Sequence, residues 1–488
     1  MEIKELNPVS VWGIFDEITK VPRPSKKEEK IRAYIKKFAA DRKLFCKEDE
    51  AGNILVSRPA SPDFENVPVV TLQAHMDMVC DKVAGVKIDF EKDALKPYID
   101  GDWVTADGTT LGADNGIGIA AALALLTDET LQTGPVEALF TVDEETGLGG
   151  AKALKDGFIS GKYLINLDSE EEGEIFIGCA GGADTVATFV HNPMMAPPNY
   201  HFMKISVSGL KGGHSGGDIH LGRGNAIKIL SRFLCPAIDK HKIVLVSFEG
   251  GSLRNAIPRE ASAVIGVPVD SKERITVELN MFAATVGEEL KGVDDDFVMK
   301  WESVETCKTA IDRQASYVLL NALNACPHGV ISMSAEMKGL VETSTNLASV
   351  KRSGDNKIVV CTSQRSSIDS MKEAIVASME SLFMLAGAKV SHGDSYPGWR
   401  PDRKSELLKV AVEAYKESFD DRKPQVKAIH AGLECALFLK KYPTLDMISI
   451  GPTMADVHTP DERMYIPSVE RFYTFLKAIL VKVAEQSK

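Results

Sequence analysis

Imidazole and carboxylate side chains recur in this chain at one kind of position, at the end of an apolar run or in the loop that follows it. His75 and Asp77 follow the run VVTLQA, and Glu144 and Glu145 end ALFTVDEE. Three further candidates share this context: Asp114 in TTLGADNG, Asp168 in YLINLDSE, and His458 in GPTMADVHTP. Such a set suits Zn²⁺, Mn²⁺ or Co²⁺, because it lacks a thiolate and holds too much imidazole for Ca²⁺ or Mg²⁺.

Each of these signals has an ordinary structural interpretation when it is taken alone. A single exposed histidine seldom ligates a metal, and acidic segments such as DEE and DSEEEGE are usually solvated loops. Here, however, the carboxylates follow apolar strands, where unpaired carboxylates packed together would repel one another and shift their pKa values. A divalent cation removes that conflict, so the group as a whole favours a metal centre.

The elements that position these residues have the pattern of an α/β domain. Up to about residue 186, a helical segment near 26–41 and later helices alternate with the strand-like runs VPVVTLQA, VEALFTV and YLINL. The apolar segment 115–126, NGIGIAAALALL, is expected to be a buried helix, and it is too short to span a membrane. A second α/β piece returns at 403–488. Ligands of open α/β sheets bind beyond the carboxyl ends of the strands, which is where the candidate residues fall.

The middle of the chain has a different pattern, in which strands such as HFMKISVSG, ASAVIGVP and KIVVCTS stand among four helices. Two stretches, 199–292 and 297–395, each hold two helices and several strands, which suggests a doubled unit without visible sequence identity. The segment 391–402, SHGDSYPGWRPD, suits a return linker. We therefore predict one domain from 1–186 and 397–488, interrupted by an α+β domain at 187–396.

Composition and charge narrow the class of function. The net charge of −12 over 488 residues argues against nucleic-acid binding, which needs clustered lysine and arginine. The first residues, MEIKELNPVSVWGIF, contain no apolar run of signal-peptide length, and nowhere do about 18 uncharged apolar residues follow one another. We expect a cytoplasmic protein that acts on a small molecule, with neither a membrane nor a nucleic acid as partner.

The motifs HMD, GADNG, DEETG, NLDSEEEGE and GPTMADVHTPDE together resemble those of the co-catalytic zinc metallopeptidases, which include carboxypeptidase G, the tripeptidases and the carnosinases. Within that group the chain most resembles the aminoacyl-histidine dipeptidases, or Xaa-His dipeptidases of the bacterial carnosinase type. Further matches are GGHSGGDIHLGRGNAI, GGSLRNAIPRE, SQRSSID, YPGWRPD and IHAGLECALF, so that the resemblance covers nearly the whole chain. It implies a mixed-sheet catalytic domain of the co-catalytic zinc exopeptidase type with the middle segment inserted as a lid.

The resemblance also implies which residues bind two divalent ions, zinc in the first instance, with manganese or cobalt as alternatives. Asp114 would bridge the ions. His75 and Asp168 would complete one site, and Glu145 and His458 would complete the other.

Two neighbours of these ligands would have other roles. Asp77 would orient His75 by accepting a hydrogen bond from its second nitrogen. Glu144 would remain free of the metals, take a proton from the metal-bridging water as general base, and pass it to the leaving amine. A cis peptide bond is implied between Asp114 and Asn115.

The lid would supply the rest of a peptidase site. His214, flanked by glycines in SGLKGGHSGG, could be an ordinary turn residue, but the resemblance implies that it stabilises the oxyanion. Asn255 would assist it, while Arg365 and the backbone at Gly432 would hold the substrate carboxylate, which a guanidinium fits well. A doubled lid would let His214 serve its own chain, and both a monomer and a homodimer agree with the sequence.

The leading interpretation is hydrolysis of unblocked dipeptides, preferentially those with C-terminal histidine, such as carnosine. Two alternatives stay open: deacylation of N-acyl amino acids on the same cluster, and a metal-binding scaffold without activity. A scaffold would be expected to lose the general base first, yet Glu144 is present.

Overall fold

The computed structural model describes residues 2–487, which form two compact units. The first unit comprises the chain up to Gly178, Pro401–Ala428 and the chain from Leu433 on, and the second comprises Cys179–Arg400 and Ile429–Gly432. These boundaries differ from those predicted at 186 and 396. The difference arises because strand β9 (Gly181–Val190) pairs within the second unit, and because the backbone N–H of Ala180 donates to the carbonyls of Ile429 and Ala431.

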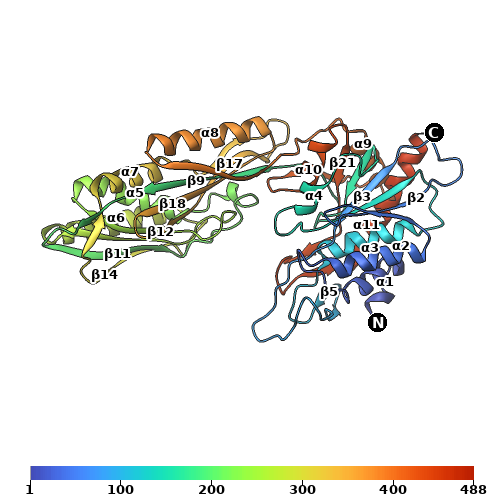
Figure 1. Cartoon of the computed structure of the whole chain (residues 1–488), viewed down its shortest axis with the longest axis horizontal. Helices are drawn as coiled ribbons and strands as arrows, with labels where there is room; N and C mark the ends of the chain where they lie inside the picture. Colours follow the sequence, from blue (N-terminus) through green and yellow to red (C-terminus); the bar gives the residue numbers. More distant parts are fainter. Residues whose placement is uncertain (1, 488) are drawn as a thin grey trace. The chain divides into compact units, whose positions relative to one another are not determined.

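An eight-stranded mixed sheet forms the centre of the first unit (Figure 1). In spatial order its strands are β1 (Phe45–Glu48), β2 (Ile54–Arg58), β6 (Val136–Thr141), β3 (Val70–His75), β7 (Tyr163–Asn166), β21 (Asp446–Ser449), β8 (Glu174–Cys179) and β20 (Gln425–Ile429). The four strands β6, β3, β7 and β21 run parallel to one another, and β2 and β8 flank them in antiparallel orientation. Every residue of β3, β6 and β7 is buried, as expected for parallel strands covered on both faces.

Helices cover this sheet and include the predicted buried helix. They are α1 (Val9–Ile18), α2 (Glu29–Asp41), α3 (Ala113–Leu126), α4 (Gly149–Ala153), α9 (Glu406–Ser418), α10 (Glu434–Lys441) and α11 (Ile466–Gln486). Helix α3 is apolar on all sides, packs against β3 and β6, and is in turn covered by α1 (Figure 1). A small sheet completes the unit, with strands β22 (Met454–Ala455), β23 (Arg463–Tyr465), β5 (Trp103–Ala106) and β4 (Pro97–Asp100).

The second unit is built on an antiparallel sheet of nine strands (Figure 1). In spatial order these are β14 (Val298–Ser303), β11 (Tyr200–Ser208), β13 (Ala261–Pro268), β12 (Val244–Gly250), β17 (Val341–Arg352), β18 (Lys357–Ser366), β9 and β19 (Lys389–Tyr396), with β16 (Gly329–Met333) beside β17. Its helices are α5 (Ala226–Lys240), α6 (Lys272–Glu289), α7 (Arg313–Ala325) and α8 (Asp369–Leu385). A separate strand pair joins β10 (Pro193–Met195) and β15 (Thr309–Ile311).

The doubled unit expected from the sequence is visible in this sheet. One half follows the chain as β11-α5-β12-β13-α6-β14 and the other as β9-α7-β17-β18-α8-β19, and in both halves the four strands lie in the spatial order 4-1-3-2. The halves meet where β12 pairs with β17. The expected division at 199–292 and 297–395 was inexact, because β14 closes the first half and β9, which precedes the first half in the chain, opens the second.

One hydrophobic core serves both halves of the second unit. It joins Leu230 of α5, Leu279 of α6, Leu320 of α7 and Met379 of α8 to sheet residues such as Ile265. All four helices therefore pack against one face of the sheet. No helix within residues 2–487 combines the length and apolar composition needed to cross a membrane.

Candidate metal centre and polar cluster of the second unit

The parallel strands of the first unit bring the predicted ligands to one edge of the sheet. His75 is the last residue of β3, Glu144 and Glu145 come shortly after β6, and Asp168 comes two residues after β7. Asp114 lies in the first turn of α3, where the backbone departs from helical geometry. Carboxyl ends of parallel strands lie together, so residues far apart in the chain meet at this edge.

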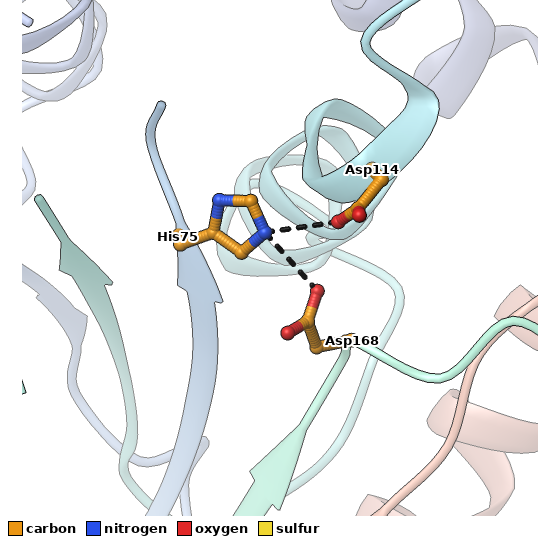
Figure 2. A group of neighbouring side chains, drawn as sticks. All are labelled: His75, Asp114 and Asp168. Carbon is orange, nitrogen blue, oxygen red and sulfur yellow. Dashed lines mark hydrogen bonds and ion pairs between the residues drawn. The ribbon is translucent and has the colours of Figure 1, made fainter. Parts of the chain in front are cut away.

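Asp114 is at the centre of the cluster. Figure 2 shows a ring nitrogen of His75 facing the carboxylates of Asp114 and Asp168, and this Nε2 atom lies 2.9 Å from Oδ1 of Asp114 and 3.3 Å from Oδ1 of Asp168. The other oxygen of Asp114, Oδ2, lies 3.0 Å from Nε2 of His458. That same nitrogen lies 3.2 Å from Oε2 of Glu145. Each oxygen of Asp114 thus faces one imidazole–carboxylate pair, as expected of a bridging ligand.

Within residues 2–487, three groups of histidine and acidic side chains have ligand atoms that all lie within 4.8 Å of one another. They are His75 with Asp114 and Asp168, Asp114 with Glu145 and His458, and His75 with Glu144 and Glu145. The first two are the two predicted half-sites. The third group contains Glu144. Distances alone therefore do not show that Glu144 is the general base and not a metal ligand. Oε1 of Glu145 is buried without a hydrogen-bond partner among residues 2–487, and a cation would satisfy it.

The electrostatics of the cluster also fit a cation. Burial would raise the pKa of Asp114, but hydrogen bonds with His458 and His75 hold it well below its usual range. Burial raises the pKa of Asp168 to about 6, and burial raises that of Glu144 well above its ordinary value. The hydrogen bond with Asp114 raises the pKa of His458 to about 11. Buried carboxylates crowded in this way are the environment that divalent cations neutralise.

Asp77 links the end of β3 to the segment that carries the two glutamates. Nδ1 of His75 lies 3.1 Å from the carbonyl oxygen of Asp77 and 3.4 Å from its carboxylate. That carboxylate accepts hydrogen bonds from the backbone N–H groups of Glu144 at 3.0 Å and Glu145 at 3.2 Å, and from the hydroxyl of Ser25 at 2.8 Å. Burial would raise the pKa of Asp77, but the hydrogen bond with His75 and its charge lower it to about 2.

The peptide bond between Asp114 and Asn115 is cis, as the resemblance implied. The side-chain amide of Asn115 donates to the carbonyl of Leu167 at 2.9 Å and to the carboxylate of Asp168. Asn115 therefore joins the start of α3 to the loop that carries Asp168.

His214 lies in the second unit, in the loop after β11. Its backbone N–H donates to the carboxylate of Asp218 at 2.9 Å, and its Nδ1 accepts from the backbone N–H of Gly217 at 3.1 Å. Burial and the nearby charge of Arg365 lower the pKa of His214 to about 4. The ring is therefore neutral near pH 7, and its proton is on Nε2, since Nδ1 is an acceptor.

The other predicted residues of the second unit lie at two places: Asn255 lies beside the His214 loop, and Arg365 and Gly432 lie beside Tyr396. The carbonyl of Asn255 accepts from the backbone N–H of Ser215 at 2.7 Å, which places Asn255 beside the His214 loop. Arg365 donates from Nη1 to the hydroxyl of Tyr396 at 3.0 Å, while its buried Nε has no hydrogen-bond partner in the part of the chain that the structure describes. A Cβ atom on Gly432 would lie 2.9 Å from the Tyr396 ring. Tyr396 thus lies against both Arg365 and Gly432.

Several polar residues of these clusters were missed in the sequence. Tyr396, His430 and Glu462 lie in or beside the motifs YPGWRPD, IHAGLE and HTPDE, which could have drawn attention to them. In the structure Nε2 of His430 lies 2.7 Å from the hydroxyl of Ser344. Arg23 gave no signal, because the segment PRPSKK is typical of an exposed loop.

Known proteins of similar sequence and fold were found. The model of Peptidase family M20/M25/M40 matches residues 71–482. The chain is 43% identical over 482 residues to the cytosol non-specific dipeptidase of Escherichia coli (strain K12), and the match covers 99% of each chain. The crystal structure of aminoacylhistidine dipeptidase from Vibrio alginolyticus has a TM-score of 0.90 and 42% identity, and the match covers 99% of this chain and 98% of that one.

A more distant structure, that of aminopeptidase PepT from Bacillus cereus ATCC 10987, has a TM-score of 0.58 and 19% identity, with 98% of this chain and 99% of that one covered. It shares the fold. The two full-length matches confirm the resemblance and the fold class inferred from the motifs.

Proposed function

This chain belongs to peptidase family M20/M25/M40, and on that premise we propose that it is a metal-dependent dipeptidase that prefers substrates with C-terminal histidine. One full-length relative is named a non-specific dipeptidase and the other an aminoacylhistidine dipeptidase, so both names support dipeptides as substrates. The observation that carries the proposal is the carboxylate of Asp114, whose two oxygens each face an imidazole. The word "cytosol" in the first relative's name supports a cytoplasmic location.

In this proposal His75, Asp114 and Asp168 would hold one divalent ion, and Asp114, Glu145 and His458 would hold a second. Zinc suits this set of donors best, and manganese or cobalt are alternatives. Two such ions, when bound, make a water molecule more acidic and polarise the scissile carbonyl.

Glu144 transfers the proton. It takes a proton from the attacking water and delivers it to the leaving amine, and burial, which raises its pKa, suits a carboxyl group that must both accept and give up a proton. Asp77 orients His75 and holds the backbone of Glu144, so that ligand and base keep a fixed geometry.

Residues of the second unit bind the rest of the substrate. His214 is neutral and donates from Nε2 to the developing oxyanion, with Asn255 beside it. The guanidinium of Arg365 and the backbone at Gly432 bind the terminal carboxylate of the dipeptide, and Tyr396 keeps Arg365 in place.

A substrate panel tests the proposal. The zinc-loaded enzyme is assayed with carnosine, other Xaa-His dipeptides, dipeptides without histidine and N-acetylated amino acids. We expect turnover of dipeptides, the highest kcat/KM for Xaa-His, and none of the acylated amino acids. Turnover of the acylated set alone would establish the deacylase alternative instead, and turnover of nothing would leave the scaffold alternative.

A further inference from the structure

A buried carboxylate binds the loop that leads into the bridging residue. Glu462 is only 2% exposed, and it accepts hydrogen bonds from four consecutive backbone N–H groups at distances between 2.7 and 3.3 Å. The donors are Leu111, Gly112, Ala113 and Asp114. One side chain therefore fixes the backbone of the whole loop up to the residue whose carboxylate lies between the half-sites.

A buried guanidinium binds the same loop through its carbonyl groups. Arg23, also 2% exposed, donates to the carbonyl of Gly112 and to those of Met76 at 3.1 Å and Asp77 at 2.8 Å. Met76 and Asp77 directly follow His75. Arg23 therefore ties the end of β3 to the Asp114 loop.

The loop is shaped to admit this guanidinium. Gly112 has a φ of +67°, and a Cβ atom there would lie 2.6 Å from Nη2 of Arg23. A Cβ atom on Gly116 would lie 2.8 Å from the same nitrogen. Glycine at both positions leaves the space in which the charged group sits.

Two buried charges are a poor means of adding stability. Desolvation of each ion offsets much of the attraction, and apolar replacements of buried ion pairs are often neutral or stabilising. Within residues 2–487, Arg23 and Glu462 form no direct ion pair; each binds backbone groups of the loop instead. The arrangement specifies the geometry of one loop, and that loop carries Asp114.

We propose that Glu462 and Arg23 are positioning residues that together hold the carboxylate of Asp114 in place for two metal ions. Glu462 comes four residues after His458, so it also joins the segment of one ligand to the loop of the bridging ligand. This inference rests on the proposed function, since it concerns the same metal centre.

The test is a zinc titration of chelator-stripped protein, in which both dissociation constants are measured for wild type and variants. Glu462→Gln removes one of the two accepting oxygens and the charge, and we expect it to weaken binding of at least one zinc ion about 10- to 100-fold. Circular dichroism and thermal unfolding of the same samples report the fold.

Glu137 offers a matched control in the same unit. It is 4% exposed, lies in β6, and accepts from the backbone N–H groups of Ser160 at 2.7 Å and Gly161 at 3.0 Å and from the hydroxyl of Thr71 at 2.7 Å. Glu137→Gln should lower the unfolding temperature and leave both zinc dissociation constants unchanged. If it weakens zinc binding as much as Glu462→Gln does, the loss is general destabilisation and the inference is wrong.

A variant at Arg23 gives a second, independent test. Arg23→Lys keeps the charge but replaces two donating nitrogens with one, and it should also weaken zinc binding at least tenfold. It decides the question if Glu462→Gln does not fold. The double variant Arg23→Lys with Glu462→Gln should lose no more affinity than the worse single variant, because the two side chains act on one loop.

The outcomes separate this inference from the function on which it rests. Wild-type zinc affinity in folded Glu462→Gln or Arg23→Lys would overturn the positioning role and leave the dipeptidase proposal intact. A wild-type protein that binds no zinc, manganese or cobalt would overturn the metal-dependent function and the inference with it.

Discussion

Glu144 and Glu145 are neighbours with different surroundings. Oε2 of Glu145 lies 3.2 Å from the imidazole of His458, and its other oxygen is buried without a hydrogen-bond partner among the described residues. The backbone N–H of Glu144, like that of Glu145, donates to the carboxylate of Asp77. A carboxylate oxygen of Glu144 lies within 4.8 Å of a ring nitrogen of His75. We propose Glu145 as the metal ligand and Glu144 as the general base, and a comparison of one variant at each position tests this assignment.

We expect Glu144→Ala to retain two metal ions per chain while kcat falls by about 10² to 10⁴, the usual cost of losing a general acid–base group. Metal analysis and turnover are measured on one sample. Glu145→Ala is the matched comparison, and it should lose one of the two ions. Metal loss in Glu144→Ala that parallels its loss of activity would mean that the two roles are exchanged.

At the scale of elements, three histidines of the second unit have pKa values that burial lowers to about 4 or less. Burial lowers the pKa of His214 and of His328 to about 4, and that of His430 to about 3, with Arg365 or Lys228 adding positive charge nearby. In His328 the ring Nδ1 faces the backbone N–H of Leu347 at 3.4 Å and the amide of Asn225 at 3.3 Å, which a protonated Nδ1 could not accept.

This predicts acid sensitivity of the second unit. Between about pH 6.5, where unfolded histidine titrates, and about pH 4, the unfolded chain binds more protons than the folded one, so stability is lost as the pH falls through this window. Hydrogen exchange of peptides from α5 and β17 should accelerate between pH 7 and 4.5, after correction for intrinsic rates. His328→Gln should lessen the effect, whereas replacement of the exposed His220 by Gln should not.

Several of these strands and contacts were predicted from the sequence. Apolar runs ending in polar residues predicted β3, β6 and β7 and the meeting of His75, Glu144 and Asp168, because parallel strands align their carboxyl ends. The doubled sheet was predicted from element order. The boundary between its two halves was not predicted, because β9 pairs with β18, which lies far from it in the sequence.

Arg23 and Glu462 were missed for a related reason. Charged residues are rarely buried, and nothing in PRPSKK sets Arg23 apart from a charged residue in solvent. The motif HTPDE could draw attention to Glu462, but it does not indicate that this carboxylate binds a distant loop. Their role depends on backbone groups of Gly112 and its neighbours, nearly 90 residues from Arg23 and about 350 from Glu462.

At the scale of the whole molecule, the proposal requires His214 and Glu144, which belong to different units, to act on one substrate. They could come from one chain or from two chains of a homodimer. Because the second unit already joins two similar halves in one sheet, we favour delivery within one chain.

Mixing two inactive variants, His214→Ala and Glu144→Ala, under conditions that allow subunits to exchange decides between these routes. Delivery within the chain predicts no recovery of activity in the mixture. Delivery across a dimer would restore roughly a quarter of wild-type activity, through hybrid dimers with one intact site.

The central claim is that dipeptide hydrolysis depends on two divalent ions held by His75, Asp114, Glu145, Asp168 and His458. The most direct measurement is the rate of carnosine hydrolysis by chelator-stripped enzyme as zinc is added in known equivalents per chain. The account predicts no turnover without metal, since the ligand carboxylates and imidazoles have no catalytic role of their own, and full turnover close to two equivalents. Full turnover of a preparation shown to contain no metal would contradict it.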